Sequence, residues 1–90
     1  MKEYLMTLEA WEPSLYDLLK AQKKLVLSFE TERGALTGKI ISVELGHDEF
    51  PSLLSVDDEK TGERVVSFRQ MVRVISHDKI IWDIENSQQQ

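Results

Sequence analysis

The stretch from Leu25 to Ile75 decides the fold, because five short runs of β-type residues follow one another there with turn signals between most of them. The runs are LVLSFETE (25–32), ALTGKIISVEL (35–45), SLLSVDDE (52–59), RVVSF (64–68) and VRVI (72–75). Short strands at this spacing are typical of a small, strongly bent antiparallel barrel. A barrel of this size is filled by its own side chains, so we expect any binding function on loops, rims or edges.

One short helix is expected ahead of these strands, over about residues 13–23. Pro13 suits a first helical turn, and Ser14 with Asp17 three residues later resembles a capping box. The apolar positions recur at helical spacing: Leu15, Leu18 and Leu19. Such a stripe indicates that the helix lies across one mouth of the barrel.

Gly38 lies inside the second and longest run, between Leu36 and Ile40. Glycine weakens the interior of a strand, because it brings no side chain and the largest loss of backbone freedom. We therefore predict that residue 38 marks a sharp bend or a close approach of another backbone, which lets a short sheet curl.

Length and composition predict one domain, because 90 residues with 41% hydrophobic and 30% charged content suit one modest core. We expect an N-terminal arm at 1–12, the helix and barrel at 13–77, and a C-terminal arm with a polar tail at 78–90. The apolar run at 80–84 fits either a sixth strand or a packing arm. The polar residues 86–90 are expected to lack regular structure. Trp11 and Trp82 are expected to pack the arms against the domain.

The charge balance argues against a general binder of phosphate backbones, since the net charge is −5 and the basic residues are spread out. No run approaches the ~20 apolar residues of a membrane span, and the first residues lack the layout of a signal peptide. We therefore expect a cytoplasmic protein that does not contact membranes. The chain has no cysteine, and His47 and His77 lack partners at catalytic or metal-binding spacing, so we expect no enzyme activity, metal or cofactor.

The order of a helix, a bent strand with an internal glycine, two further strands and a very short link to a last strand resembles the Sm-like family, which includes the bacterial Hfq RNA chaperones. The likeness covers about residues 14–76 and is carried by these segments: Leu15–Leu19, Leu25–Phe29, Gly34, Leu36–Ile40 and Phe68–Ile75. It implies a mainly β fold, in which a short N-terminal helix precedes a five-stranded, strongly bent antiparallel SH3-like or Sm-like barrel. Other small SH3-type barrels also place a glycine in a curved second strand and stay open as the alternative.

The resemblance also implies a function. Proteins of this family form rings in which strand four of one subunit pairs with strand five of the next, so a homo-oligomer is expected. They bind single-stranded RNA through the loop after strand two and the link between strands four and five. At those positions Phe50 or Phe68 would stack on a base, Arg69 would contact phosphate and Gln70 would read a base edge. The chain departs from Hfq at this link, where Ser67 to Gln70 replace a Tyr-Lys-His run.

Two hypotheses therefore follow from the sequence. The first is a non-enzymatic barrel that self-assembles and binds single-stranded RNA at its rim. The second is an acidic interaction module that binds a basic protein partner and no nucleic acid. The net charge and the cluster Asp57-Asp58-Glu59 favour the second, although such clusters usually serve as solvated turns that protect strand edges.

Overall fold

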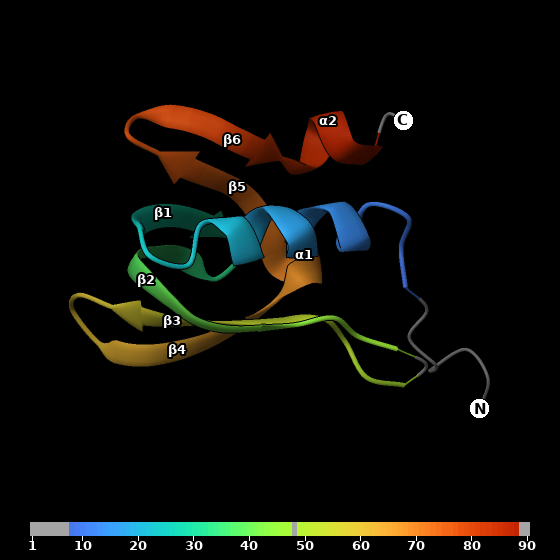
Figure 1. The fold of residues 1–90 in the computed structure, drawn as a ribbon, viewed down its shortest axis with the longest axis horizontal. Helices are drawn as coiled ribbons and strands as arrows, with labels where there is room; N and C mark the ends of the chain where they lie inside the picture. Colours follow the sequence, from blue (N-terminus) through green and yellow to red (C-terminus); the bar gives the residue numbers. More distant parts are fainter. Residues whose placement is uncertain (1–7, 48, 89–90) are drawn as a thin grey trace.

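The structure is a computed structural model that describes residues 8–47 and 49–88. The elements are α1 (Glu12–Ala21), β1 (Val26–Thr31), β2 (Gly34–Glu44), β3 (Leu53–Asp58), β4 (Gly62–Ser67), the 3₁₀ helix η2 (Phe68–Gln70), β5 (Met71–Ser76), β6 (Lys79–Asp83) and α2 (Ile84–Gln88). The strands form one antiparallel sheet in the order β4-β3-β2-β1-β5-β6 (Figure 1). The fold is therefore mainly β, as the sequence predicts.

The sheet is open and has six strands, so the prediction of a five-stranded barrel is confirmed only in its mainly β character and its short leading helix. The chain turns through η2 after β4, and β5 then pairs with β1 rather than with β4. In Figure 1 the pair β3–β4 and the pair β5–β6 consequently lie on opposite sides of β1 and β2. The sixth strand forms because Trp82 pairs with Val74 across the sheet and is buried against the core.

Gly38 is a point of close backbone approach, as predicted. It pairs with Leu27 on β1 and with Asp58 on β3. A β-carbon at this position would lie 1.9 Å from the carbonyl oxygen of Asp57, a separation that no side chain tolerates. The register of β2 against β3 then shifts between Ile40 and Ser42, which adds to the bend of the strand.

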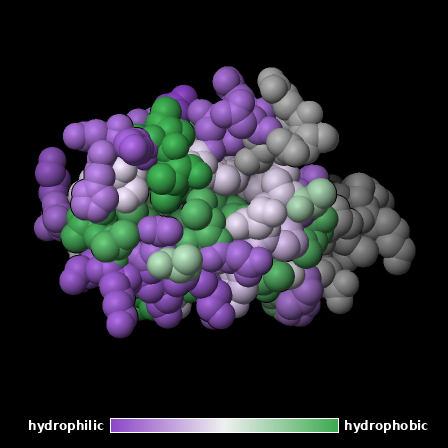
Figure 2. Space-filling view, turned by 45° about the horizontal axis from the view of Figure 1, so that its top comes forward, coloured by the Kyte–Doolittle hydropathy of each residue, from purple (hydrophilic) through white to green (hydrophobic). Residues whose placement is uncertain are grey.

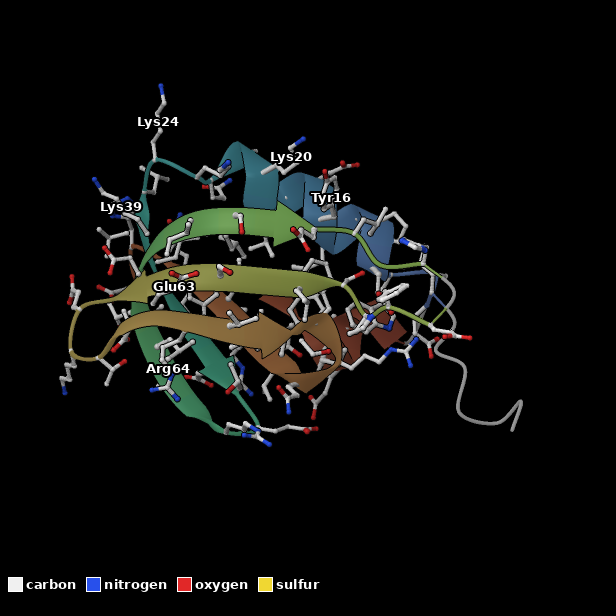
Figure 3. All side chains as sticks on the ribbon, turned by 90° about the horizontal axis from the view of Figure 1, so that it is seen from below. Tyr16, Lys20, Lys24, Lys39, Glu63 and Arg64 are labelled. Atoms are coloured by element: carbon white, nitrogen blue, oxygen red, sulfur yellow. The ribbon has the colours of Figure 1, made fainter. Side chains whose placement is uncertain are left out.

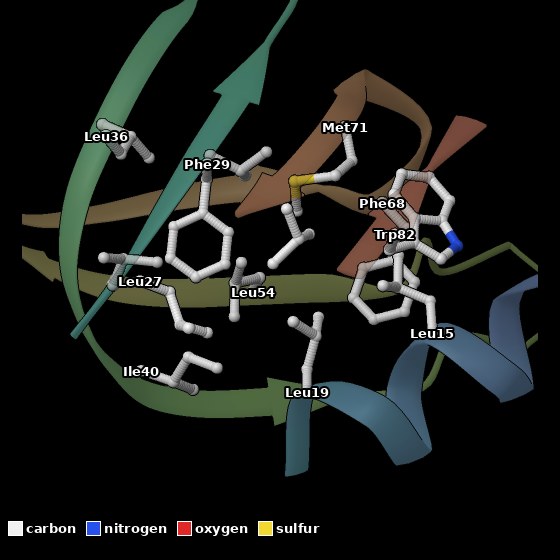
Figure 4. Close-up of a cluster of buried hydrophobic side chains, with 13 residues drawn as sticks. Leu15, Leu19, Leu27, Phe29, Leu36, Ile40, Leu54, Phe68, Met71 and Trp82 are labelled. Carbon is white, nitrogen blue, oxygen red and sulfur yellow. The ribbon is translucent and has the colours of Figure 1, made fainter. Parts of the chain in front are cut away.

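The hydrophobic core lies under the curved sheet and is covered on one side by α1 (Figure 4). Leu15 and Leu19 of α1 are fully buried, because their spacing of four residues places both on the face that meets the sheet. The buried apolar side chains of the sheet and of η2 are Leu27, Phe29, Leu36, Ile40, Leu54, Val56, Val66, Phe68, Met71, Val74 and Trp82. Every strand contributes to this set, so the bend and the core form together.

Helix α1 begins one residue before the predicted start, and the predicted capping box is wrong. Trp11 is the N-cap residue and makes no side-chain capping bond, while Pro13 lies in the first turn. Ser14 lies inside the helix with its side chain exposed. The side chain of Glu12 instead accepts a hydrogen bond from the backbone N–H of Glu9 at 3.0 Å, so the chain before the helix is fixed by a buried carboxylate.

The C-terminal segment is more ordered than the sequence predicts. Residues 84–88 form α2, so the expectation that the polar tail from residue 86 lacks regular structure is wrong as far as residue 88. Residues 89–90, like residues 1–7 of the N-terminal arm, lie outside the described residues. Trp82 is buried in the core and Trp11 packs against it, as expected of residues that hold the arms to the domain. The two rings also contact each other, with centres 5.5 Å apart at an interplanar angle of 43°.

Arg73 connects three neighbouring strands. From β5 it pairs with Glu30 on β1, and its Nε lies 3.4 Å from Asp83 Oδ2 on β6. The hydrogen bond to Asp83 and the charge of Glu30 raise the pKa of the Arg73 guanidinium above its usual value. The sixth strand is thus held by a charged contact as well as by the burial of Trp82.

Candidate binding site at the start of helix α1

A buried carboxylate organises the end of the molecule where α1 begins. The side chain of Glu12 is only 2% exposed. Ser52 Oγ donates to Glu12 Oε1 at 2.7 Å, and Arg69 Nε donates to Glu12 Oε2 at 3.3 Å. Burial of a carboxylate is costly unless donors surround it, and here the donors are a hydroxyl, a guanidinium and the Glu9 backbone N–H. Glu12 therefore ties α1 to the loop after β2 and to η2.

The loop between β2 and β3 is held against the same network. Ser52 Oγ accepts a hydrogen bond from the backbone N–H of Gly46 at 2.7 Å, and the Ser52 carbonyl accepts one from the N–H of Phe68 at 2.9 Å. A β-carbon on Gly46 would lie 2.4 Å from the carbonyl oxygen of Phe50, so only glycine fits where the loop closes. The loop and η2 are consequently adjacent.

A pocket of about 350 Å³ opens beside this network. Its walls come from four places: the chain before α1, the β1–β2 turn, the η2–β5 junction and the start of α2. The lining residues are Glu9, Trp11, Glu32, Arg69, Met71, Val72 and Ile84. The pocket thus combines an aromatic side chain, aliphatic side chains and charged groups in one small volume.

The charges around the pocket do not cancel. Arg69 is paired with Glu12, so these two charges compensate each other. Glu9 and Glu32 are exposed, and their carboxylates make no ion pair or hydrogen bond to any residue in the described ranges. The remaining charge at the pocket is therefore negative. Lys20 lies in the last turn of α1, at the far end of the helix from Glu12.

The lysines near the end of α1 point outward and away from the core. Figure 3 shows Lys20, Lys24 and Lys39 extending from α1, from the segment after it and from β2. The Nζ atom of Lys20 lies 5.1 Å from the ring centre of Tyr16, so this charge is partly held over an aromatic face. Lys39 in turn lies opposite Asp57 in the pairing of β2 with β3, so these lysines do not form an isolated basic patch.

Trp11 carries an unmatched polar group next to the pocket. Its Nε1 atom is buried and has no hydrogen-bond acceptor among the described residues. A buried donor without an acceptor costs free energy and is uncommon in native structures. Such mismatches are expected at functional positions more often than at purely structural ones.

The four residues that the sequence assigns to RNA binding lie in quite different environments. Phe68 is fully buried in the core, so its ring offers no face for stacking a base. Arg69 is one-third exposed and paired with Glu12. Gln70 is half-buried, and its backbone carbonyl accepts a hydrogen bond from the Glu32 N–H at 2.8 Å. Phe50 is 64% exposed in the loop after β2.

Asp58 is a structural residue of the β3–β4 turn. Its side chain accepts hydrogen bonds from the backbone N–H groups of Thr37, Lys60 and Thr61 and from the Thr61 hydroxyl, at 2.9 to 3.1 Å. These bonds, with the Thr37 N–H as the largest cause, lower the pKa of Asp58 from 3.8 to about 2. Its neighbours Asp57 and Glu59 are exposed.

Glu12, Glu9 and Glu32 are not among the residues predicted from the sequence, although the sequence carries one signal for Glu12. Glu12 precedes Leu15 by three residues and Leu19 by seven, so it falls on the apolar stripe of the helix. A charged residue at such a position is expected to be buried with partners. No comparable signal marks Glu9 or Glu32, because these two residues come to line the same pocket only when β1, β5 and the start of α1 pack together.

Both histidines are exposed. His47 is an exposed loop residue whose ring centre lies 5.3 Å from that of Phe50. His77 is exposed in the turn between β5 and β6 and has a positive φ of 51°. Within the described ranges, no three His, Asp or Glu residues gather closely enough to hold a metal ion. Across those same residues, no helix has the length and apolar character needed to cross a bilayer.

Comparison with known proteins found no matching family model, no similar curated protein and no similar solved structure.

Proposed function

We propose that the chain is a binding module that receives a basic segment of a partner protein at the pocket beside Trp11. The observation that carries this proposal is the pair of exposed carboxylates, Glu9 and Glu32, at a pocket whose one arginine is already neutralised. Opposite charges near a partly enclosed surface attract a cationic partner and speed its association. The same electrostatics disfavour phosphate at this end of the molecule.

A titration with a basic peptide tests this function. Fluorescence of the tryptophans would follow binding of a hexalysine peptide at low and at raised salt. We expect saturable binding that weakens as salt rises, because screening reduces attraction between charges beyond about 8–10 Å at physiological ionic strength. A matched hexaglutamate peptide should not bind. Equal binding of both peptides, or none at all, would contradict an acidic receiving surface.

RNA binding at the rim is the second candidate, and one observation favours it. The loop after β2 and η2 are adjacent through the hydrogen bond between Phe68 N–H and the Ser52 carbonyl, so the two segments named by the resemblance form one surface. Phe50 provides an exposed ring there. In this proposal Phe50 and Gln70 contact RNA, while Arg69 would first have to leave Glu12. Titration with a short uridine or adenosine oligomer tests it, since Phe50→Ala should then weaken binding.

The barrel and its self-assembly remain part of the proposal. The return of β5 to β1 through a 3₁₀ link supports an SH3-like or Sm-like arrangement. β6, however, lies on the far side of β5, so a ring built on this sheet would join β4 of one copy to β6 of the next. Ile80 of β6 is 57% exposed. Figure 2, which is turned so that the top of Figure 1 comes forward, shows hydrophobic side chains among hydrophilic ones on the visible face.

Light scattering measures this directly. A stable closed ring would support edge-to-edge assembly, and an Ile80→Lys variant should then dissociate it, because the added charge would lie in the contact. A wild-type monomer at the concentrations used for binding would remove self-assembly from the proposal. A monomer would still have the complete pocket, since every lining residue of the pocket belongs to one chain.

A further inference from the structure

We infer that the pocket beside Trp11 holds a single lysine or arginine side chain of the partner, with its aliphatic stem inside and its cationic end at the rim. This inference rests on the proposed function and specifies what the basic segment inserts. The pocket volume of about 350 Å³ lies near the lower end of the roughly 300–1,000 Å³ typical of ligand pockets. It therefore suits one extended side chain rather than a folded element.

The apolar part of the pocket matches an aliphatic stem. The apolar lining consists of four residues. Met71 and Val72 are the first residues of β5, Ile84 is the first residue of α2, and Trp11 immediately precedes α1. Trp11 is fixed in place because its ring packs on Trp82, which is itself 9% exposed. Long basic side chains bury their methylene groups against such surfaces while the charge stays near water. An indole is also the aromatic group that attracts cations most strongly.

The charged part of the pocket matches a cation at its mouth. Glu9 and Glu32 both line the pocket, from the chain before α1 and from the β1–β2 turn, and both are exposed, so we place the cation of the inserted side chain on their side of the pocket. Arg69 also lies in the wall, but its guanidinium is held by Glu12 at 3.3 Å, which compensates its charge. Because Arg69 Nε bonds Glu12 and the Glu12 charge offsets that of Arg69, a ligand carboxylate or phosphate would gain less from Arg69 than from an unpaired arginine.

The chain supplies a control site with the same charge change. Glu63 of β4 and Glu59 of the β3–β4 turn are exposed, and their side chains make no bond to any other described residue. Neither belongs to the pocket. The pair of substitutions Glu59→Gln and Glu63→Gln therefore removes two negative charges from the protein without altering the pocket. Glu9→Gln with Glu32→Gln removes the same number at the pocket.

The experiment compares three proteins and three peptides by amide chemical shifts. The proteins are wild type, Glu9→Gln/Glu32→Gln and Glu59→Gln/Glu63→Gln. The peptides are hexalysine, hexa-arginine and hexalysine acetylated on every Nε atom. We expect the amide signals of Val72 and Ile84 to shift with hexalysine or hexa-arginine. The acetylated peptide should cause no shift, because acetylation removes the charge.

The expected result is that the pocket variant weakens binding about tenfold or more while the control variant changes it less than about threefold. An equal loss in both variants would show that the peptide responds to total charge, which overturns the pocket assignment and leaves the basic-partner function standing. Absence of binding to the wild-type protein would overturn both. Normal unfolding midpoints of the two variants, whose substituted side chains are all exposed, exclude misfolding as the cause.

Discussion

Replacing Gly38 by alanine tests whether the close approach of β3 to β2 is what allows the sheet to bend. The added β-carbon would lie 1.9 Å from the Asp57 carbonyl oxygen and 2.7 Å from its carbonyl carbon. Restoring even a 3.0 Å separation requires a displacement of about 1.1 Å. The obstructing atoms belong to backbone, so a rotamer change cannot relieve the contact, and the β2–β3 pairing itself has to shift.

The magnitude follows from two opposing effects. Alanine reduces the freedom of the unfolded chain and is worth about 0.4–1 kcal/mol where it fits. Forcing atoms into a packed position costs about 1–3 kcal/mol, and more where the backbone has to move. We therefore expect Gly38→Ala to lower the free energy of unfolding by about 2–3 kcal/mol. For a domain of this size that lowers the melting temperature by roughly 10–20 °C.

Urea unfolding followed by tryptophan fluorescence measures the loss, and Gly62→Ala is the comparison. Gly62 has a φ of +84° and nothing within 4 Å of its added β-carbon, so its alanine variant reports conformational strain alone. That strain should cost about 1–2 kcal/mol. If Gly38→Ala costs no more than Gly62→Ala, the sheet accommodates a side chain at residue 38, and the explanation of its bend is wrong.

Three further predictions concern buried polar and aromatic groups. The pKa of Asp58 in the folded protein is about 2 instead of 3.8, so the unfolded chain binds more protons at low pH. The free energy of unfolding should therefore fall as the pH drops from about 5 to 2. Asp58→Asn should flatten this pH dependence, as measured by urea titrations. Glu12→Ala should cost about 1–3 kcal/mol, because the buried Ser52 hydroxyl loses its acceptor while the one-third exposed Arg69 can still be solvated. Phe68→Ala should cost about 3–5 kcal/mol in unfolding free energy.

Each of these has a matched control. Asp57→Asn removes an exposed neighbouring carboxylate and should leave the pH profile of stability unchanged. Glu9→Ala removes an exposed carboxylate but keeps the backbone N–H that donates a hydrogen bond to Glu12. This substitution should therefore change the free energy of unfolding by less than about 0.5 kcal/mol. Phe50→Ala removes a ring that is 64% exposed and should be similarly mild. Equal losses for Phe50→Ala and Phe68→Ala would contradict the burial of Phe68.

The strands between Leu25 and Ile75 were predictable because their signals are local. Alternating residues in β1 place Leu27 and Phe29 on one face, and that face is the buried one. Gly38 was recognisable because an interior glycine has few other uses in a strand. The length of the link at Arg69–Met71 predicted a tight turn or a 3₁₀ turn, and the structure has a 3₁₀ helix one residue earlier, at Phe68–Gln70.

The helix start and the sixth strand were harder to predict. Ser14 carries a capping signature, but the start of α1 is set by Glu12, whose partners Ser52 and Arg69 lie 40 and 57 residues away. Residues 79–83 are too short a run to distinguish a strand from an arm by pattern. They form a strand because their backbone pairs with the edge of β5 and because the side chain of Trp82 is buried against the core.

The pocket could not be predicted at all, because its lining residues lie between positions 9 and 84 of the chain. The resemblance directed attention to Phe68 and Arg69, which are adjacent in sequence but face different surroundings, one in the core and one beside Glu12. A single-residue shift along a 3₁₀ turn is enough to move a side chain from buried to accessible.

The mainly β character, the leading helix and the glycine at the bend could be predicted from the sequence, because these depend on contacts and preferences within a few residues. The strand that covers the outer side of β5, the identity of the buried carboxylate and the unpaired charges at the pocket became apparent from the three-dimensional fold. Those outcomes depend on segments distant in sequence meeting across one small core, where burying a charge is permitted only if donors from elsewhere arrive to meet it.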